Sequence, residues 1–180
     1  EAVARLVPWE GDADLLHDAA RGDPAALSSP ELAAWLNANA EALAQFRAAT
    51  LYDAKGWNLH SQDGTLLGVL LPDLSGIRAL SRGTIIEGRR LAAAGQSDEA
   101  AQQYLDVLGA GAHVGSGMPL IENLVGVAMQ GPAADALLDL QAEPAAGGLD
   151  YATLASELEA AYRPTRPAAE AVQGERAFFL

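Results

Sequence analysis

The chain has 180 residues, and its 11 basic residues against 24 acidic ones give a formal net charge of −13 at pH 7. It contains no cysteine, which excludes disulfide scaffolds, thiolate metal sites and cysteine nucleophiles. Half of its residues are hydrophobic and only 19% are charged, so we expect a folded domain rather than an acidic disordered chain. Its negative charge also opposes binding to nucleic-acid phosphates.

The first third of the chain predicts two helices. Residues 12–20 carry apolar side chains on one side, and Gly22-Asp23-Pro24 then ends the helix. Ser29 and Pro30 form a strong start signal, because a capping side chain precedes a proline in the first turn. From there, apolar residues recur at steps of three and four up to about Thr50, which is the period of an amphipathic helix.

Helical periodicity disappears between residues 51 and 71. The Asp63-Gly64 pair is typical of a tight hairpin turn, here between residues 57–59 and 65–67. Neither flank alternates cleanly between apolar and polar residues, however. A small hairpin and an irregular loop are therefore both open for this stretch, which we treat as one irregular segment.

The rest of the chain predicts five more helices, separated by breaks rich in glycine and proline. The expected helices are 72–94, 98–108, 119–130, 133–140 and 151–162. The expected breaks are a turn at 95–98, a glycine-rich connection at 109–117, Gly131-Pro132, and a linker at 143–148. The fold class is thus all-α, a bundle of about seven or eight helices with one irregular segment. We expect a single domain over 1–163 and a C-terminal extension over 164–180.

The stretch from Thr84 to Ala112 resembles the helical hairpin of a tetratricopeptide repeat. The matching positions are Gly88, Gly95, Ala100 and Tyr104. In that family a small residue lets two helices approach, a glycine makes the turn, an alanine packs at the crossing and an aromatic residue fills the neighbouring groove. A weaker echo follows at Gly131, Ala136 and Leu140. The resemblance implies repeat-like hairpins over about 73–141, but not a complete repeat array.

A wider similarity covers residues 32–140. It is carried by the runs 70–80 and 119–128, which resemble alanine-rich helical proteins of high-GC bacteria. Proteins of that family are often exported and have no established activity. The resemblance therefore implies a helical fold and an exported, periplasmic location, and it transfers no catalytic residue.

No complete catalytic or cofactor motif is present. The 109–117 stretch has valine where the dinucleotide fingerprint needs glycine, and it lacks the Lys-Ser/Thr pair of a P-loop. His17, His60 and His113 lie far apart and show no metal-ligand spacing. We therefore name no catalytic residue and expect neither a cofactor nor a metal.

The strongest functional signal lies in the expected helix 72–94. Arg78, Arg82 and Arg89 fall on the side opposite its packing face, with Ile85 beside them. Basic residues are scarce in this chain, so the row has two interpretations. It either pairs internally, with Glu87, Asp98, Glu99 or Glu122, or it forms a face that binds a partner or an anion.

Two further features bear on function. The segment 118–129 is apolar nearly all round, which predicts a central, buried helix in which Glu122 is paired or protonated. The last residues include Phe178 and Phe179. An exposed pair of phenylalanines would dock a partner, and a buried pair would fasten the terminus to the core; a truncated chain is the third alternative.

Together these signals favour a non-enzymatic protein-interaction module, or a structural subunit of a larger bacterial envelope complex. The candidate partner-binding residues are Arg78, Arg82, Ile85, Arg89, Phe178 and Phe179. The alternative is an enzyme that binds a small molecule or a metal near Glu122 and His113. No stretch is long and apolar enough to cross a membrane, while peripheral membrane association stays open.

Overall fold

The structure is a computed structural model that describes residues 1–52, 60–61, 69–70, 74–117, 120–142, 150–161, 167, 169–170 and 172–173. Within these ranges the chain is all-α, as predicted, with nine helices. They are α1 (Ala2–Arg5), α2 (Ala13–Ala20), α3 (Pro24–Leu27), α4 (Pro30–Ala38), α5 (Ala40–Ala49), α6 (Leu74–Ala93), α7 (Ser97–Gly115), α8 (Leu120–Ala142) and α9 (Tyr151–Ala161).

Two short strands lie in the segment that the sequence left as a hairpin or a loop. β1 (His60–Ser61) and β2 (Val69–Leu70) pair antiparallel, with His60 opposite Leu70. An antiparallel pair is what a hairpin requires, although both strands lie outside the flanks that the sequence suggested. The Asp63-Gly64 turn itself lies outside the described residues.

Capping side chains start the N-terminal helices. Asp23 accepts a hydrogen bond from the backbone N–H of Ala26 at 2.8 Å, which opens α3 where the sequence predicted only the end of a helix. Ser29 caps α4 as predicted, by accepting from the N–H of Leu32. The single helix expected up to about Thr50 is divided at Asn39 into α4 and α5.

Asn39 holds the N-terminal segment against this division. Its side chain is fully buried. Its Oδ1 accepts from the N–H of Val7 at 2.7 Å, and its Nδ2 donates to the carbonyl of Val7 at 3.1 Å. The Trp35 indole donates to the same carbonyl at 2.9 Å. Apolar periodicity could not predict this break, because a contact with a distant segment causes it.

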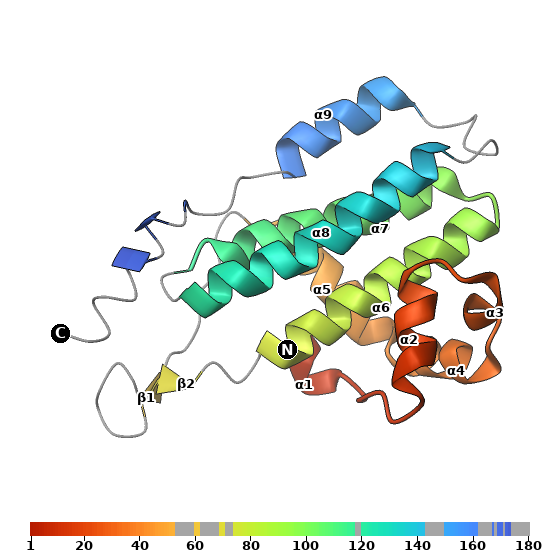
Figure 1. The fold of residues 1–180 in the computed structure, drawn as a ribbon, viewed down its shortest axis with the longest axis horizontal. Coiled ribbons are helices and arrows are strands. Elements are labelled where there is room, and N and C mark those ends of the chain that lie inside the picture. The colour runs from red at the N-terminus through yellow and green to blue at the C-terminus, as the bar shows by residue number, and fades with distance from the viewer. Residues whose placement is uncertain are drawn as a thin grey trace.

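The three longest helices, α6, α7 and α8, pack as antiparallel neighbours (Figure 1). The shorter helices α1 to α5 gather against one side of α6, and α9 packs on α7. Leu80 and Ile86 of α6 and Tyr104 and Leu108 of α7 are among the most deeply buried side chains. The hydrophobic core therefore lies between α6, α7, α8 and the N-terminal helices.

Two predicted breaks were wrong, because α7 continues through Gly109 and Gly111 and α8 continues through Pro132. A Cβ on Gly111 would lie 2.9 Å from the Gly126 carbonyl, and one on Gly126 would lie 2.5 Å from the Gly111 carbonyl. These glycines let two helix backbones touch, and do not form a loop.

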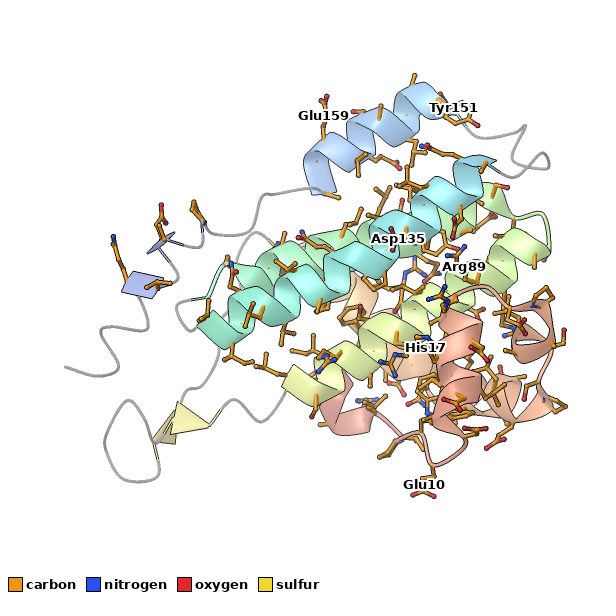
Figure 2. All side chains as sticks on the ribbon, viewed as in Figure 1. Glu10, His17, Arg89, Asp135, Tyr151 and Glu159 are labelled. Carbon is orange, nitrogen blue, oxygen red and sulfur yellow. The ribbon has the colours of Figure 1, made fainter. Side chains whose placement is uncertain are left out.

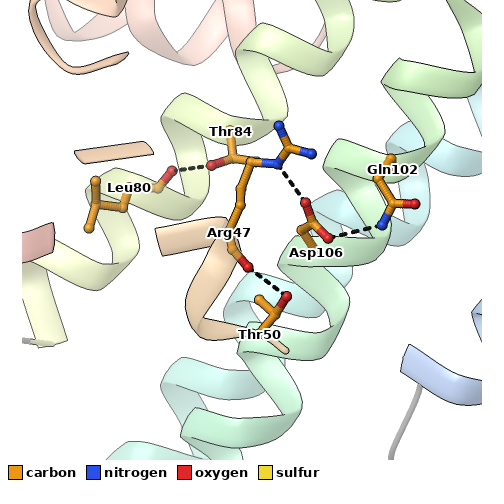
Figure 3. A network of polar contacts seen from close by, with 6 residues as sticks. All are labelled: Arg47, Thr50, Leu80, Thr84, Gln102 and Asp106. Atoms are coloured by element: carbon orange, nitrogen blue, oxygen red, sulfur yellow. Dashed lines mark hydrogen bonds and ion pairs between the residues drawn. The ribbon is translucent and has the colours of Figure 1, made fainter. Parts of the chain in front are cut away.

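A polar network ties α5 to α7 behind this core (Figure 3). Arg47 Nε donates to Asp106 Oδ2 at 2.5 Å, and Gln102 Nε2 donates to Asp106 Oδ1 at 3.0 Å. Since the Asp106 side chain is only 11% exposed, two donors on its carboxylate satisfy a group that would be costly to bury alone.

Candidate functional site

A cleft of about 510 Å³ lies where α2, α6 and α8 meet. Four arginines line it, namely Arg21, Arg78, Arg82 and Arg89. More than a third of the chain's eleven basic residues thus gather at one place in a protein of net charge −13. We call this region the arginine cleft.

The two long walls of the arginine cleft differ in chemistry. The α6 wall is basic, and Arg78 and Arg82 are exposed on it. The α8 wall presents Ala128, Met129, Pro132 and Leu138, with Asp135 and Asp139 in its C-terminal half. Figure 2 shows Arg89 between α6 and α8, with His17 and Asp135 on the helices that flank it. Four arginines against two aspartates leave a local charge of +2 with His17 neutral.

Internal pairing accounts for only part of the arginine row. Arg89 Nη2 lies 2.6 Å from Asp139 Oδ2, an acid that the sequence did not suggest as its partner. The neighbouring Arg90 pairs with Glu87 at 3.1 Å. Arg78 and Arg82 form no ion pair with any residue that the structure describes. Two guanidinium groups are therefore available to an outside acceptor.

The other candidate partner-binding residues have different places. Ile85 lines the arginine cleft but is only 3% exposed, so its side chain belongs to the core beneath the arginines. Phe178 and Phe179 lie outside the described residues.

The candidate enzyme site does not coincide with the arginine cleft. Glu122 is 1% exposed in the first turn of α8, and His113 is half-buried in the last turn of α7. Neither residue lines the arginine cleft. Among the described residues, no three His, Asp or Glu side chains lie close enough together to hold a metal ion.

A second cleft, of about 780 Å³, adjoins the first at Arg89 and Asp139 and reaches Tyr104. Tyr104 packs against Gly88, where a Cβ would lie 2.4 Å from the tyrosine ring. The two residues that the hairpin pattern singled out do therefore meet. Burial raises the pKa of Tyr104 to about 12, while nearby Arg89 opposes this rise and Asp139 adds to it. The raised pKa extends the pH range over which the buried phenol stays neutral.

Sequence reasoning missed the contributions of α2 and α8 to the arginine cleft. Arg21 follows the last turn of α2, and His17 lies one turn earlier. Both are far from the α6 row in sequence, so no local period connects them. Pro132 predicted a break between two helices, whereas it lies inside α8 and at the cleft. It lacks an N–H, so the Ala128 carbonyl receives no intrahelical bond from it, and both residues line the cleft.

No family model, no curated protein and no solved structure matches this chain. None of the helices in the described ranges combines the length and the hydropathy that crossing a bilayer requires. The arginine cleft therefore has to be interpreted from its own chemistry.

Proposed function

We propose that this protein is a non-enzymatic interaction module that docks an acidic segment of a protein partner in the arginine cleft. In this role it is a structural subunit of a larger, exported assembly of the bacterial envelope. The α6–α7–α8 hairpins are the rigid scaffold, in keeping with the tetratricopeptide-like pattern of Gly88, Gly95, Ala100 and Tyr104.

The observation that carries the proposal is the pair of exposed arginines, Arg78 and Arg82, without an acidic partner among the described residues. Guanidinium groups bind carboxylates through two parallel hydrogen bonds, and arginine is enriched at protein interfaces. The facing α8 wall supplies the apolar contact that such an interface also needs.

The surrounding acidity of the protein sharpens this selectivity. The net charge of −13 repels acidic segments, whereas the local charge of +2 at the arginine cleft attracts them. Opposite charges then set the orientation of the partner and raise its rate of association. Binding should weaken as salt concentration rises, because the two exposed arginines are screened by ions.

The test compares two single variants that change the net charge equally. Arg82→Glu reverses a cleft arginine, whereas Arg5→Glu reverses an arginine that pairs with Glu41 between α1 and α5. Native mass spectrometry of each complex, isolated from the source cells, identifies the partner, and titration gives its affinity. We expect Arg82→Glu to weaken partner binding by about 30-fold or more and Arg5→Glu to leave it unchanged.

Two outcomes would contradict the proposal. One is equal binding of the partner by the two variants, because the cleft would then take no part in docking. The other is an 18.6 kDa species that carries a bound small molecule and no protein partner.

A further inference from the structure

The outward side of α8 carries Gly131, beside which the described protomer leaves open space beyond the glycine's own chain neighbours. At five other helical glycines a Cβ would come within 3.0 Å of a neighbouring atom, namely Gly76, Gly83, Gly88, Gly111 and Gly126. At Gly109 the contact is an ordinary 3.8 Å, and at Gly131 nothing lies within 4 Å. Glycine inside a helix costs about 1 kcal/mol relative to alanine. Pro132 explains part of this cost, because a proline crowds a Cβ on the residue before it in a helix. The open space beside Gly131 also leaves room for a close approach from outside.

Large apolar side chains flank Gly131 on both sides. Ile121, Leu124 and Val127 precede it and Leu138 follows it, and each is 49–63% exposed. The outward positions of α8 carry no charge before Asp135. Such an exposed apolar row, interrupted by Asp135 before Leu138, is typical of a protein–protein contact.

Gly131 is the midpoint of α8, which spans Leu120–Ala142. If a second α8 crosses there in the antiparallel direction, positions equally far before and after Gly131 come level. Leu138 of the second copy then meets Leu124. Asp135 of the second copy comes level with Val127. The apolar row is therefore complementary to itself about a two-fold axis.

The charges of the arginine cleft match the same axis. The Arg89–Asp139 ion pair fixes how α6 lies along α8, and the two helices run in the same direction. Arg78 lies eleven residues before Arg89 on α6, and Ala128 lies eleven residues before Asp139 on α8. Arg78 is therefore level with Ala128. Asp135 of the second copy therefore arrives beside Arg78, which has no acidic partner among the described residues.

From these observations we propose that two copies of this chain associate through α8, antiparallel across Gly131, with Asp135 of each copy bound by Arg78 of the other. This rests on the proposed function, since it names a second copy as the acidic partner of the arginine cleft. Glycine at the crossing lets the two backbones approach closely, and every contact occurs twice.

The lack of cysteine allows a direct test. Gly131→Cys places a single thiol on the axis, and a disulfide needs Cα atoms about 4.4–6.8 Å apart. We expect mild oxidation to convert this variant into a covalent dimer. The control Leu51→Cys, at a position that is 84% exposed after α5, should remain mostly uncrosslinked. Light scattering of the unmodified chain should give twice 18.6 kDa.

Two further variants separate the contact from folding. Gly131→Leu fills the crossing, and its Cβ has open space beyond its chain neighbours, so we expect an 18.6 kDa species that keeps its helical circular dichroism. Arg78→Glu should weaken the dimer about tenfold or more, and adding Asp135→Arg should restore it by exchanging the charges of each pair.

The proposal is overturned if the unmodified chain stays at 18.6 kDa at every concentration and Gly131→Cys does not crosslink. Sedimentation of that monomer with vesicles of anionic phospholipid would identify a membrane surface as the occupant instead. If the chain is such a monomer and Arg82→Glu loses a different protein partner, the proposed function stands and the proposed dimer does not. A dimer that Arg78→Glu leaves intact would overturn the role of the cleft, while the crossing at Gly131 would stand.

Discussion

Two glycines of α8, five residues apart, show how differently the two sides of one helix are used. Gly126 faces α7, where a Cβ would lie 2.5 Å from the Gly111 carbonyl and 2.6 Å from Gly115 Cα. Gly131 faces outward and would meet nothing within 4 Å. The same residue type therefore serves a contact with α7 at one position and faces open space at the other. The open space beside Gly131 leaves room for a contact outside.

Burial divides α8 in a way that its composition does not. Ala133 and Ala136 are fully buried on the inner side, whereas Val127 and Leu138 are at least half exposed on the outer side. The sequence predicted that segment 118–129 is central and buried because it is apolar all round. This was correct for Val125 and wrong for Leu124, which is 55% exposed. A helix can also be apolar all round because its second side meets another molecule.

The largest expected effect contrasts two adjacent leucines. Leu137 is 5% exposed and Leu138 is 63% exposed. Leu137→Ala removes buried methyl groups and leaves a cavity, so we expect the free energy of unfolding to fall by about 3 kcal/mol. Leu138→Ala should change the protomer by less than about 0.5 kcal/mol. Urea titration of both dilute variants checks this, and equal losses would show that the two sides are packed alike.

A smaller loss is expected for Gly126→Ala. The added methyl group has no room against the backbone of α7, so the helices must separate. Overpacking typically costs about 1–3 kcal/mol, and a methyl group 2.5 Å from a backbone atom belongs to the upper half of that range, against a helix-propensity gain of about 1 kcal/mol. We expect a net loss of about 1–2 kcal/mol in urea titration. A variant as stable as the parent would contradict the close approach of α7 and α8.

Gly131→Ala should cost less than Gly126→Ala. Beyond its chain neighbours the methyl group meets nothing within 4 Å, so the helix-propensity gain of about 0.5–1 kcal/mol is opposed only by crowding against the ring of Pro132. Thermal unfolding at high dilution, where a dimer contributes least, measures this net change. A loss as large as that of Gly126→Ala would contradict an open outer side of α8.

The smallest effect at neutral pH is expected for Tyr104→Phe, at the contact between α6 and α7. The hydroxyl is buried and has no hydrogen-bond partner among the described residues, so its removal should be nearly neutral. Its pKa is about 12 in the folded chain, above the ordinary 10.0. The resulting stability is fully present below pH 10 and is lost as pH rises towards 12. The Phe variant should lack this part of the alkaline fall in Tm; identical pH profiles would contradict a buried phenol.

Local signals predicted the helical class and most helix starts, because capping and periodicity involve neighbouring residues. Ser29 caps α4, and Gly95 makes the turn after α6 with a positive φ of 79°. Gly111, which lies at a contact between helices, was predicted to be part of a break, since the Gly126 that it meets is far away in sequence. The residues next to a glycine do not show whether it breaks a helix or lets two helices approach.

The arginine cleft was predictable only on its α6 side. The helical period placed Arg78, Arg82 and Arg89 together, but it could not bring in Arg21 from α2 or choose Asp139 as the partner of Arg89. Ile85 shared the period of the row, yet its burial depends on how α2 and α8 pack over α6. The local sequence thus determines which side of a helix a residue occupies, whereas the helices that pack against it determine whether that side chain is exposed.

The contact between Asn39 and Val7 has a consequence for how this sequence can vary. Asn39 exchanges two hydrogen bonds with the main chain of residue 7, while the Val7 side chain is 47% exposed. Because every residue type except proline offers that N–H and carbonyl, evolution can replace Val7 freely at little cost. Asn39 has no such freedom, since few side chains both donate and accept with this geometry. Of the two residues in this contact, position 7 therefore tolerates substitution and position 39 does not.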